Sequence, residues 1–240
     1  MGGGESLGVV SDLWRYPVKS FGGERVRAAF AGPFGVLGDR RHALLDAAGA
    51  PMSARRHHAL LGYRARYLDP DAADQVEVTT PDESVHAWDD PALAERLGEE
   101  FGQDIHMVRS PASVHDAAPV HIITTASLGA ASDWTPGEEM DVRRFRPNVV
   151  IDMDGLDAFT EAAWPGLSVE VGDDGPALMI VSPTERCAVT TFDPDTLERD
   201  NRVLKGLAAD RENLFGVYAV VSRPGWLRVG AEVRITRSAA

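Results

Sequence analysis

The single cysteine of the chain, Cys187, has neighbours that favour a reactive thiol. Arg186 precedes it, and a nearby cation lowers the pKa of a thiol and so favours the thiolate, which is both a nucleophile and a soft metal ligand. A lone cysteine can form neither an intramolecular disulfide nor an all-cysteine zinc site. The alternative is a small buried residue of a core. Because Glu185 and Asp193 are polar neighbours, we expect Cys187 at the rim of a loop, acting as a single thiolate.

Basic side chains gather in three short segments, each at an expected strand or turn boundary. These are Lys19-Ser20, Gly38-Asp39-Arg40-Arg41 and Arg143-Arg144-Phe145-Arg146-Pro147-Asn148. A planar guanidinium pairs bidentately with phosphate oxygens, and lysine binds phosphate as a point charge. Taken singly, each segment is also compatible with a solvated surface charge. Together with a soft thiolate, the three segments indicate a site for an anionic cofactor.

The charge and composition of the chain exclude several classes of protein. Its 240 residues carry 37 acidic and 24 basic side chains, a formal net charge of −13. This charge opposes sequence-independent binding to nucleic acid or anionic lipid, which needs a positive face. No apolar run approaches the roughly 18 residues that span a bilayer, and the first residues lack the pattern of a signal peptide. We therefore expect a cytoplasmic protein with no nucleic-acid and no membrane partner.

Short strand signals separated by glycine and proline dominate the sequence. They favour a β-barrel or sandwich over βαβ units. We expect three short helices, at residues 90–102, 127–132 and 201–209, and the first of them connects two halves of the chain. Strands are expected at 60–68 and 75–80, as a hairpin at 167–171 and 177–181, and at 215–222, 226–229 and 232–236. The expected fold class is mainly β with a few short helices (α+β).

Five segments, in their order and spacing, resemble the MOSC proteins, named for the molybdenum cofactor sulfurase C-terminal domain. They are 13–20 (LWRYPVKS), 35–41 (GVLGDRR), 145–151 (FRPNVVI), 186–196 (RCAVTTFDPDT) and 215–218 (FGVY). The likeness runs roughly from Val9 to Ile235 and is greatest to the branch with an N-terminal β-barrel, which includes the mitochondrial amidoxime-reducing components. It implies an N-terminal MOSC β-barrel domain over residues 1–90 and a C-terminal MOSC β-barrel domain, with the metal-binding cysteine, over residues 91–240.

The resemblance also implies a cofactor and the residues that hold it. The cofactor is the molybdenum cofactor (molybdenum-molybdopterin), and Cys187 is its metal ligand and the catalytic residue. The positions that match cofactor-binding residues of the family are Lys19, Ser20, Arg40, Arg146, Asn148, Arg186, Cys187 and Tyr218. Segments 53–55 and 125–128 also resemble the family. One departure is Glu185, which stands where amidoxime-reducing relatives have a serine and adds negative charge near the metal.

The function that the resemblance implies is a molybdenum-cofactor oxidoreductase that reduces N-hydroxylated substrates, namely hydroxylamines, amidoximes or N-hydroxylated bases. Because the sequence has no four-cysteine pattern for an iron–sulfur module, electrons are expected from a separate donor protein of ferredoxin, flavoprotein or cytochrome type. The alternative hypothesis is a non-catalytic carrier of the cofactor, or of sulfur as a persulfide on Cys187. A plain thiol nucleophile is a third, although no histidine stands in a recognisable partner motif. We expect no pyridoxal phosphate site.

Overall fold

A closed β-barrel is the largest unit of the structure, a computed structural model that describes residues 5–153, 155 and 157–237. Seven strands of the described chain form it in the order β11-β10-β14-β13-β12-β16-β1, and β11 pairs back onto β1. All neighbours are antiparallel except β10 and β11, which run parallel. The bounds are β1 (Glu5–Arg15), β10 (Val120–Thr124), β11 (Val149–Met153), β12 (Leu167–Val171), β13 (Ala177–Glu185), β14 (Leu214–Arg223) and β16 (Glu232–Arg237). Closure leaves these strands without the open edge that promotes aggregation.

Aliphatic side chains fill the barrel, as expected for strands with one face turned to a core. Val10 and Leu13 of β1, Ile122 of β10 and Ile151 of β11 are each at most 1% exposed and belong to one cluster. β2 (Glu24–Val26) extends the sheet beside β1. Because β1 is held on both sides, the turn that follows it starts from a fixed point, and that turn carries two of the predicted site residues.

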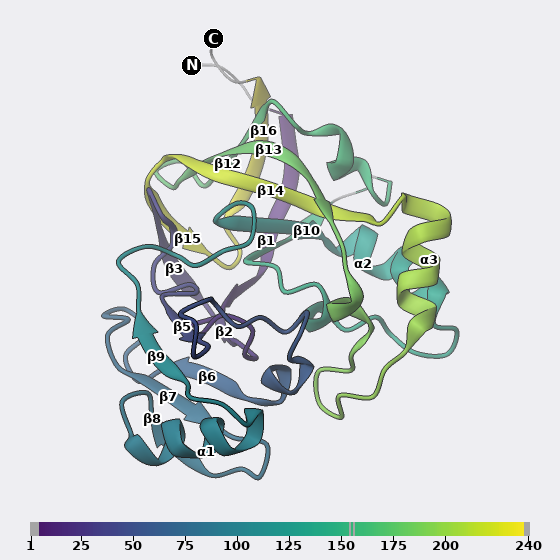
Figure 1. The fold of residues 1–240 in the computed structure, drawn as a ribbon. Helices are drawn as coiled ribbons and strands as arrows, with labels where there is room; N and C mark the ends of the chain where they lie inside the picture. The colour runs from purple at the N-terminus through teal and green to yellow at the C-terminus, as the bar shows by residue number, and fades with distance from the viewer. Residues whose placement is uncertain (1–4, 154, 156, 238–240) are drawn as a thin grey trace.

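Small sheets and one helix form the lower part of the molecule in Figure 1, around a second core. The sheets around this core are β6 (Arg64–Tyr67), β7 (Val76–Thr79) and β8 (Val85–Ala87), and β5 (His42–Leu45) and β9 (His106–Arg109). A third small sheet, of β15 (Gly225–Arg228), β3 (Ala28–Gly32) and β4 (Gly35–Val36), instead packs its buried side chains into the barrel core. Helix α1 (Pro91–Phe101) is capped by the Asp90 side chain, which accepts from the Ala92 amide, and ends at Gly102 in the left-handed conformation. Its Leu93 and Leu97 are fully buried in the second core.

A third cluster lies beside the barrel, under α2 (Thr125–Ala131) and α3 (Asn201–Arg211), which Figure 1 shows on the right. Phe145 and Phe215 stack at its centre, with ring centroids 3.9 Å apart. Short 3-10 helices complete the described chain: η1 (His58–Gly62), η2 (Ser132–Trp134), η3 (Val142–Arg144), η4 (Thr160–Ala163) and η5 (Ala188–Thr191). The stacked rings matter for function because the segments that follow them, 146–148 and 216–218, enter the site.

The fold class predicted from the sequence is confirmed, and the three expected helices correspond to α1, α2 and α3. The expected hairpin at 167–171 and 177–181 is β12 and β13. The expected strand at 60–68 is wrong in its first part, because residues 58–62 form η1, which buries Leu60, and alternation of buried and exposed side chains begins only at Arg64. The division at residue 90 stays a prediction. Three strands pair across it within the described residues: β1 with β11 and β16, β3 with β15, and β5 with β9.

Each helix in the described part of the chain is too short or too polar to cross a membrane. The expected absence of a signal peptide concerns the first residues of the chain. Of these, residues 1–4 lie outside the described residues.

Candidate functional site

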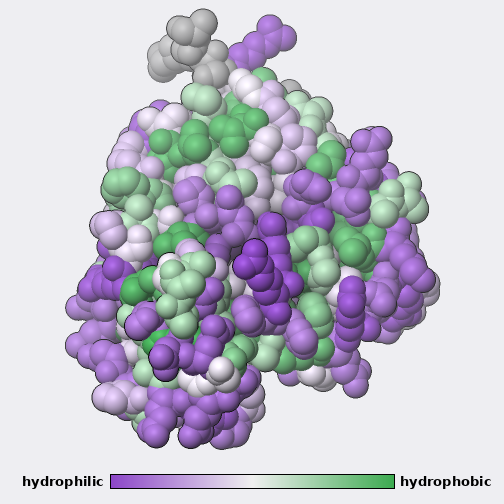
Figure 2. Space-filling view, viewed as in Figure 1, coloured by the Kyte–Doolittle hydropathy of each residue, from purple (hydrophilic) through white to green (hydrophobic). Residues whose placement is uncertain are grey.

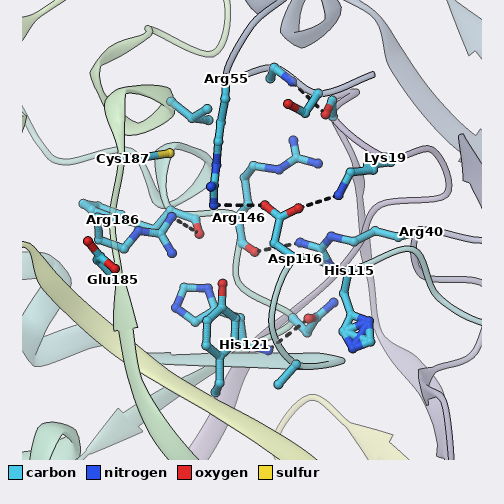
Figure 3. A pocket seen from close by; sticks show the side chains of 18 residues that line it. Lys19, Arg40, Arg55, His115, Asp116, His121, Arg146, Glu185, Arg186 and Cys187 are labelled. Carbon is cyan, nitrogen blue, oxygen red and sulfur yellow. Dashed lines mark hydrogen bonds and ion pairs between the residues drawn. The ribbon is translucent and has the colours of Figure 1, made fainter. Parts of the chain in front are cut away.

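One pocket at the junction of the barrel and the smaller sheets gathers all eight predicted site residues (Figure 3). They are Lys19, Ser20, Arg40, Arg146, Asn148, Arg186, Cys187 and Tyr218. The pocket encloses about 750 Å³ of empty space, its open mouth included, which is within the range of small-molecule and cofactor sites. On the face of the molecule seen in Figure 1, Figure 2 shows a strongly hydrophilic group of side chains at the middle, between the upper and lower parts.

Three residues that line this pocket have a strained backbone conformation. Ser20, Arg40 and Arg146 have φ angles of 71°, 49° and 52°, in the left-handed region that non-glycine residues rarely adopt. Such a conformation costs roughly 1–2 kcal/mol per residue. Ser20 follows β1, Arg40 follows β4, and Arg146 follows η3, so each lies where the chain turns sharply. The surrounding structure therefore holds three pocket residues in conformations that local preference alone would not select.

Cys187 is half-buried and lies immediately before η5, two residues after the end of β13. Its carbonyl oxygen accepts from both the amide and the hydroxyl of Thr190, at 3.1 and 3.0 Å. The amide of Arg186 donates to the Asn213 carbonyl at 2.7 Å. The backbone on either side of the thiol is thus fixed, and Figure 3 shows the sulfur at the wall of the pocket opposite Lys19 and Arg40.

Three arginines of the pocket, Arg40, Arg146 and Arg186, are half-buried, and two of them pack on one aromatic ring. Arg146 lies over the ring of Tyr16 at 4.2 Å, and Arg40 lies over the same ring at 4.9 Å. Burial, and then the charge of Arg40, lower the pKa of Arg146 to about 10. Burial also lowers the pKa of Arg186, whereas for Arg40 the lowering by burial is outweighed by the neighbouring Asp39 carboxylate, which raises its pKa. The pocket therefore concentrates positive charge where water cannot fully screen it.

Two guanidinium nitrogens of the pocket have no hydrogen-bond acceptor within the described residues. Arg146 donates through Nη1 to the Phe21 carbonyl at 2.6 Å, but its Nη2 has no partner. Arg186 donates through Nη2 to the Phe145 carbonyl at 2.8 Å, but its Nε has none. Leaving a buried charged donor without an acceptor is unfavourable by roughly 1–3 kcal/mol. Both groups are suited to the oxygens or ring atoms of an anionic ligand.

A carboxylate that the sequence analysis missed, Asp116, is the closest partner of Lys19. The Lys19 ammonium donates to Asp116 Oδ1 at 2.5 Å and to the Val114 carbonyl at 3.1 Å, and Arg55 Nη2 donates to Asp116 Oδ2 at 3.3 Å. Burial raises the pKa of Asp116, but the hydrogen bond and charge of Lys19 and the charge of Arg55 outweigh it, so the pKa is lowered. Figure 3 shows this carboxylate between the two cations. The Asp116 carboxylate thus neutralises part of the positive charge that Lys19 and Arg55 bring to the pocket.

The segment 53–55, noted for its family likeness, does reach the pocket. Arg55 is one of its cations, and the Ala54 amide donates to the Ser20 hydroxyl at 2.9 Å. Asp116 and His115 lie in the loop between β9 and β10, which carries no sequence pattern that could have marked them. The segment 125–128 lies outside the pocket, where Thr124 and Ser127 bond to the buried Glu161 carboxylate.

Asn148 and Tyr218 complete the wall beside β10. Asn148 is 1% exposed; its Oδ1 accepts from the His121 amide at 3.1 Å, and its Nδ2 donates to the Trp14 carbonyl at 3.3 Å. The rings of His121 and Tyr218 lie 5.6 Å apart. Burial, together with the charge of Arg186, lowers the pKa of His121 well below 6.5, so this imidazole is neutral at pH 7. Asn148 therefore ties β1, β10 and β11 together at the edge of the pocket.

The donor set fits an anionic cofactor whose metal takes one protein thiolate. Lys19, Arg40, Arg55, Arg146 and Arg186 line the pocket, against the carboxylates of Asp116 and of the exposed Glu185. Among the described residues, no group of three or more His, Cys, Asp and Glu side chains is placed to hold a metal ion. A soft metal that brings its other ligands on an anionic cofactor needs only a thiolate such as that of Cys187.

Comparisons with known proteins agree with this architecture. The family model for the MOSC domain matches residues 109–234, and the model for the MOSC N-terminal beta barrel domain matches residues 7–99. Mitochondrial amidoxime-reducing component 1 of Homo sapiens is 25% identical over 290 aligned positions, which cover 95% of this chain and 83% of the relative. Mitochondrial amidoxime reducing component 2 of Macaca fascicularis is 36% identical over 134 positions, covering 49% of this chain and only 37% of the relative.

A second kind of relative and one solved structure extend the comparison. Molybdenum cofactor sulfurase of Homo sapiens is 24% identical over 94% of this chain, and the chain spans 32% of that protein. The crystal structure of the YUAD protein from Bacillus subtilis covers 97% of both chains with a TM-score of 0.54 at 11% identity, which shows a shared fold. The match of the MOSC model to residues 109–234, more than half of the sequence, decides the family. The chain belongs to the MOSC family and carries both its MOSC domain and its N-terminal beta barrel domain.

Proposed function

We propose that the pocket binds the molybdenum cofactor and that the protein is an oxidoreductase that reduces N-hydroxylated compounds. The observation that carries this proposal is the convergence on one pocket of the chain's only thiol and five cations, two of which have donors without an acceptor in the described chain. The name of one relative, molybdenum cofactor sulfurase, supports the cofactor, and that of another, amidoxime-reducing component, supports the reaction. When bound, this cofactor supplies two-electron redox chemistry at the N–O bond.

Each residue of the pocket would have a role in holding the cofactor that follows from its charge and position. Cys187 supplies the thiolate ligand from a backbone that Thr190 holds in place. Lys19 and Arg55, now joined by Asp116, are placed to bind phosphate oxygens, because a terminal phosphate carries close to two negative charges. Arg146 and Arg186 offer their unpaired nitrogens to polar groups of the cofactor. Glu185, exposed at the mouth, would meet the substrate and the electron donor first.

The partners follow from the same proposal. The substrate is a small N-hydroxylated molecule, and electrons come from a separate donor protein of ferredoxin, flavoprotein or cytochrome type. The proposed location is the cytoplasm. The described residues contain one cysteine, so an iron–sulfur centre held by four cysteines has no ligands there.

The test is to purify the protein from a host that makes the cofactor and to measure molybdenum, pterin and hydroxylamine reduction with a chemical electron donor. We expect stoichiometric molybdenum in the wild type and its loss, with loss of activity, in Cys187→Ala. Arg146→Gln should lower cofactor content, whereas Arg202→Gln, on the exposed start of α3, should leave it unchanged. No molybdenum in the wild type and an unchanged Cys187→Ala would overturn the proposal. A persulfide on Cys187 without pterin would instead support a sulfur carrier.

A further inference from the structure

A second cavity adjoins the cofactor pocket and has no part in the function proposed above. Arg146 and Val189 line both cavities. Val189 belongs to η5, the short helix that begins directly after Cys187, so the second cavity lies close to the proposed metal ligand. Tyr16, whose ring supports Arg146, also lines it. A molecule in this cavity would therefore lie next to the reaction centre.

Four arginines line this second cavity: Arg64, Arg143, Arg144 and Arg146. No carboxylate is found among the side chains that line it within the described chain. The acidic partners of three of these arginines, Glu83, Asp193 and the pair Asp141 and Asp195, are outside the lining. The lining of the cavity is therefore cationic, and the carboxylates that pair with three of its arginines lie outside it.

Two deeply buried polar groups of this cavity lack a partner. Arg144 is 9% exposed; its Nη2 donates to Asp193 at 3.0 Å, but its Nη1 has no acceptor within residues 5–153, 155 and 157–237. Tyr16 is 1% exposed, and its hydroxyl likewise has no partner there. Burial raises the pKa of Tyr16, so the hydroxyl remains a donor at neutral pH. These groups supply two unused donors around one cavity, which the Arg64 side chain also lines.

The rest of the lining is apolar. Leu61, Val189, Phe192 and Pro194 form it, and the His58 ring stacks on Phe192 at 5.0 Å with an interplanar angle of 5°. The stacked imidazole fixes the orientation of the Phe192 ring. A small inorganic anion would satisfy the donors but leave these apolar surfaces exposed to water, whereas an organic anion would cover them.

We propose that this second cavity binds the carboxylate of a small organic anion with an apolar body. Tyr16, Arg64 and Arg144 would receive the carboxylate, and Leu61, Phe192 and Pro194 would pack on the body. The binding of an organic anion in this cavity does not depend on the proposed function. One consequence of it does rest on that function. If the cofactor pocket reduces N-hydroxylated compounds, the preferred substrate carries a carboxylate beside its N-hydroxylated group.

The binding test uses the purified full chain without cofactor and benzoate as the probe, followed by calorimetry. We expect saturable binding of benzoate and none of benzylamine, which has the same apolar body and the opposite charge. Arg64→Gln and Arg144→Gln should each weaken benzoate binding about five- to tenfold, the effect of losing one charge-assisted interaction. Arg66→Gln is the matched control, because Arg66 is an exposed, ion-paired arginine of the same strand that does not line the cavity. Equal affinities for all variants, or binding of inorganic phosphate but not of benzoate, would overturn the assignment.

A second measurement separates the cavity from the proposed reaction. With the cofactor-loaded protein, kcat/KM is compared for benzamidoxime and 4-carboxybenzamidoxime. We expect wild type to favour the carboxylate-bearing substrate, Arg64→Gln to reduce that preference, and Arg66→Gln to keep it. Benzoate binding with the predicted variant pattern but no reduction of either compound refutes the proposed function and leaves the cavity assigned. Reduction of both compounds with equal kcat/KM refutes the substrate class.

Discussion

Replacing Asp116 by asparagine should strengthen the binding of phosphate to the cofactor-free protein. Its carboxylate accepts from Lys19 at 2.5 Å and from Arg55 at 3.3 Å, so it occupies donors that a phosphate would need. The Asp116→Asn substitution would keep the size of the side chain and remove its charge. Both cations would then be available to the anion, and the repulsion between two neighbouring negative groups would disappear.

The magnitude follows from Coulomb's law and from the exposure of Asp116. A phosphate bound to Lys19 would lie about 5 Å from the Asp116 carboxylate, where two unit charges interact by about 3 kcal/mol at an effective dielectric constant near 20. The Asp116 side chain is 48% exposed, so water and salt reduce this to about 1 kcal/mol. A change of that size corresponds to about fivefold tighter binding.

Calorimetric titration with inorganic phosphate at low ionic strength measures this change. Asp173→Asn is the matched control, because Asp173 is 84% exposed, pairs with Arg234 and does not line the pocket. It alters the net charge of the protein by the same amount and should leave phosphate affinity unchanged. An Asp116→Asn variant that binds phosphate no better than wild type, or more weakly, would show that Asp116 positions Lys19 rather than competing with the anion.

Three further experiments test the fold around the site. His42 is 2% exposed, and burial lowers its pKa to about 4, so the imidazole resists protonation in the folded protein. The resulting stability is present above the unfolded pKa of about 6.5, so the free energy of unfolding should fall by about 2 kcal/mol between pH 8 and pH 5, and by less in His42→Phe. Urea denaturation at both pH values measures this change. Gly216→Ala should lower the free energy of unfolding by about 3 kcal/mol, because the φ of Gly216 is +73° and the new Cβ would lie 2.6 Å from the His121 ring. Gly137→Ala, at a φ of +89° in open space, should lower it by about 1 kcal/mol. Thermal unfolding compares the two variants. Asn148→Ala should lower the free energy of unfolding by about 2 kcal/mol, because the His121 amide loses its acceptor; an unchanged urea midpoint would contradict this.

Residue types and local turn signals from glycine and proline were sufficient to predict the elements near the site. Gly and Pro mark the turns at which Ser20, Arg40 and Arg146 adopt positive φ, and the basic residue types at those turns indicated an anion site. A capping aspartate, a proline at the first helical position and a terminal glycine define α1 in the sequence as they do in the structure. These signals are local, so they can be detected in one sequence.

Long-range pairing could not be predicted in the same way. β1 pairs with β11, where Leu13 lies opposite Val149, and that pairing closes the barrel and brings Lys19 to the pocket that Cys187 also lines. No local pattern encodes the partner of a strand. Asp116 was missed for a related reason: it lies in a loop whose position is set by the Val114 amide bonding to the Arg40 carbonyl at 2.8 Å, a contact between distant segments.

The burial of the pocket arginines explains why an anion should belong there. Arg146 remains protonated at pH 7, yet its pKa is lowered to about 10 by burial and by Arg40, so the folded protein holds this charge at an energetic disadvantage. Asp116 offsets part of the local positive field without reaching the unpaired nitrogens of Arg146 and Arg186. An anion that supplies acceptors to the unpaired nitrogens of both arginines would raise the pKa of Arg146 again, because an opposite charge favours the protonated guanidinium. The net charge of −13 repels polyanions over the surface as a whole, and the arginines are therefore available to a small anion that fits the pocket.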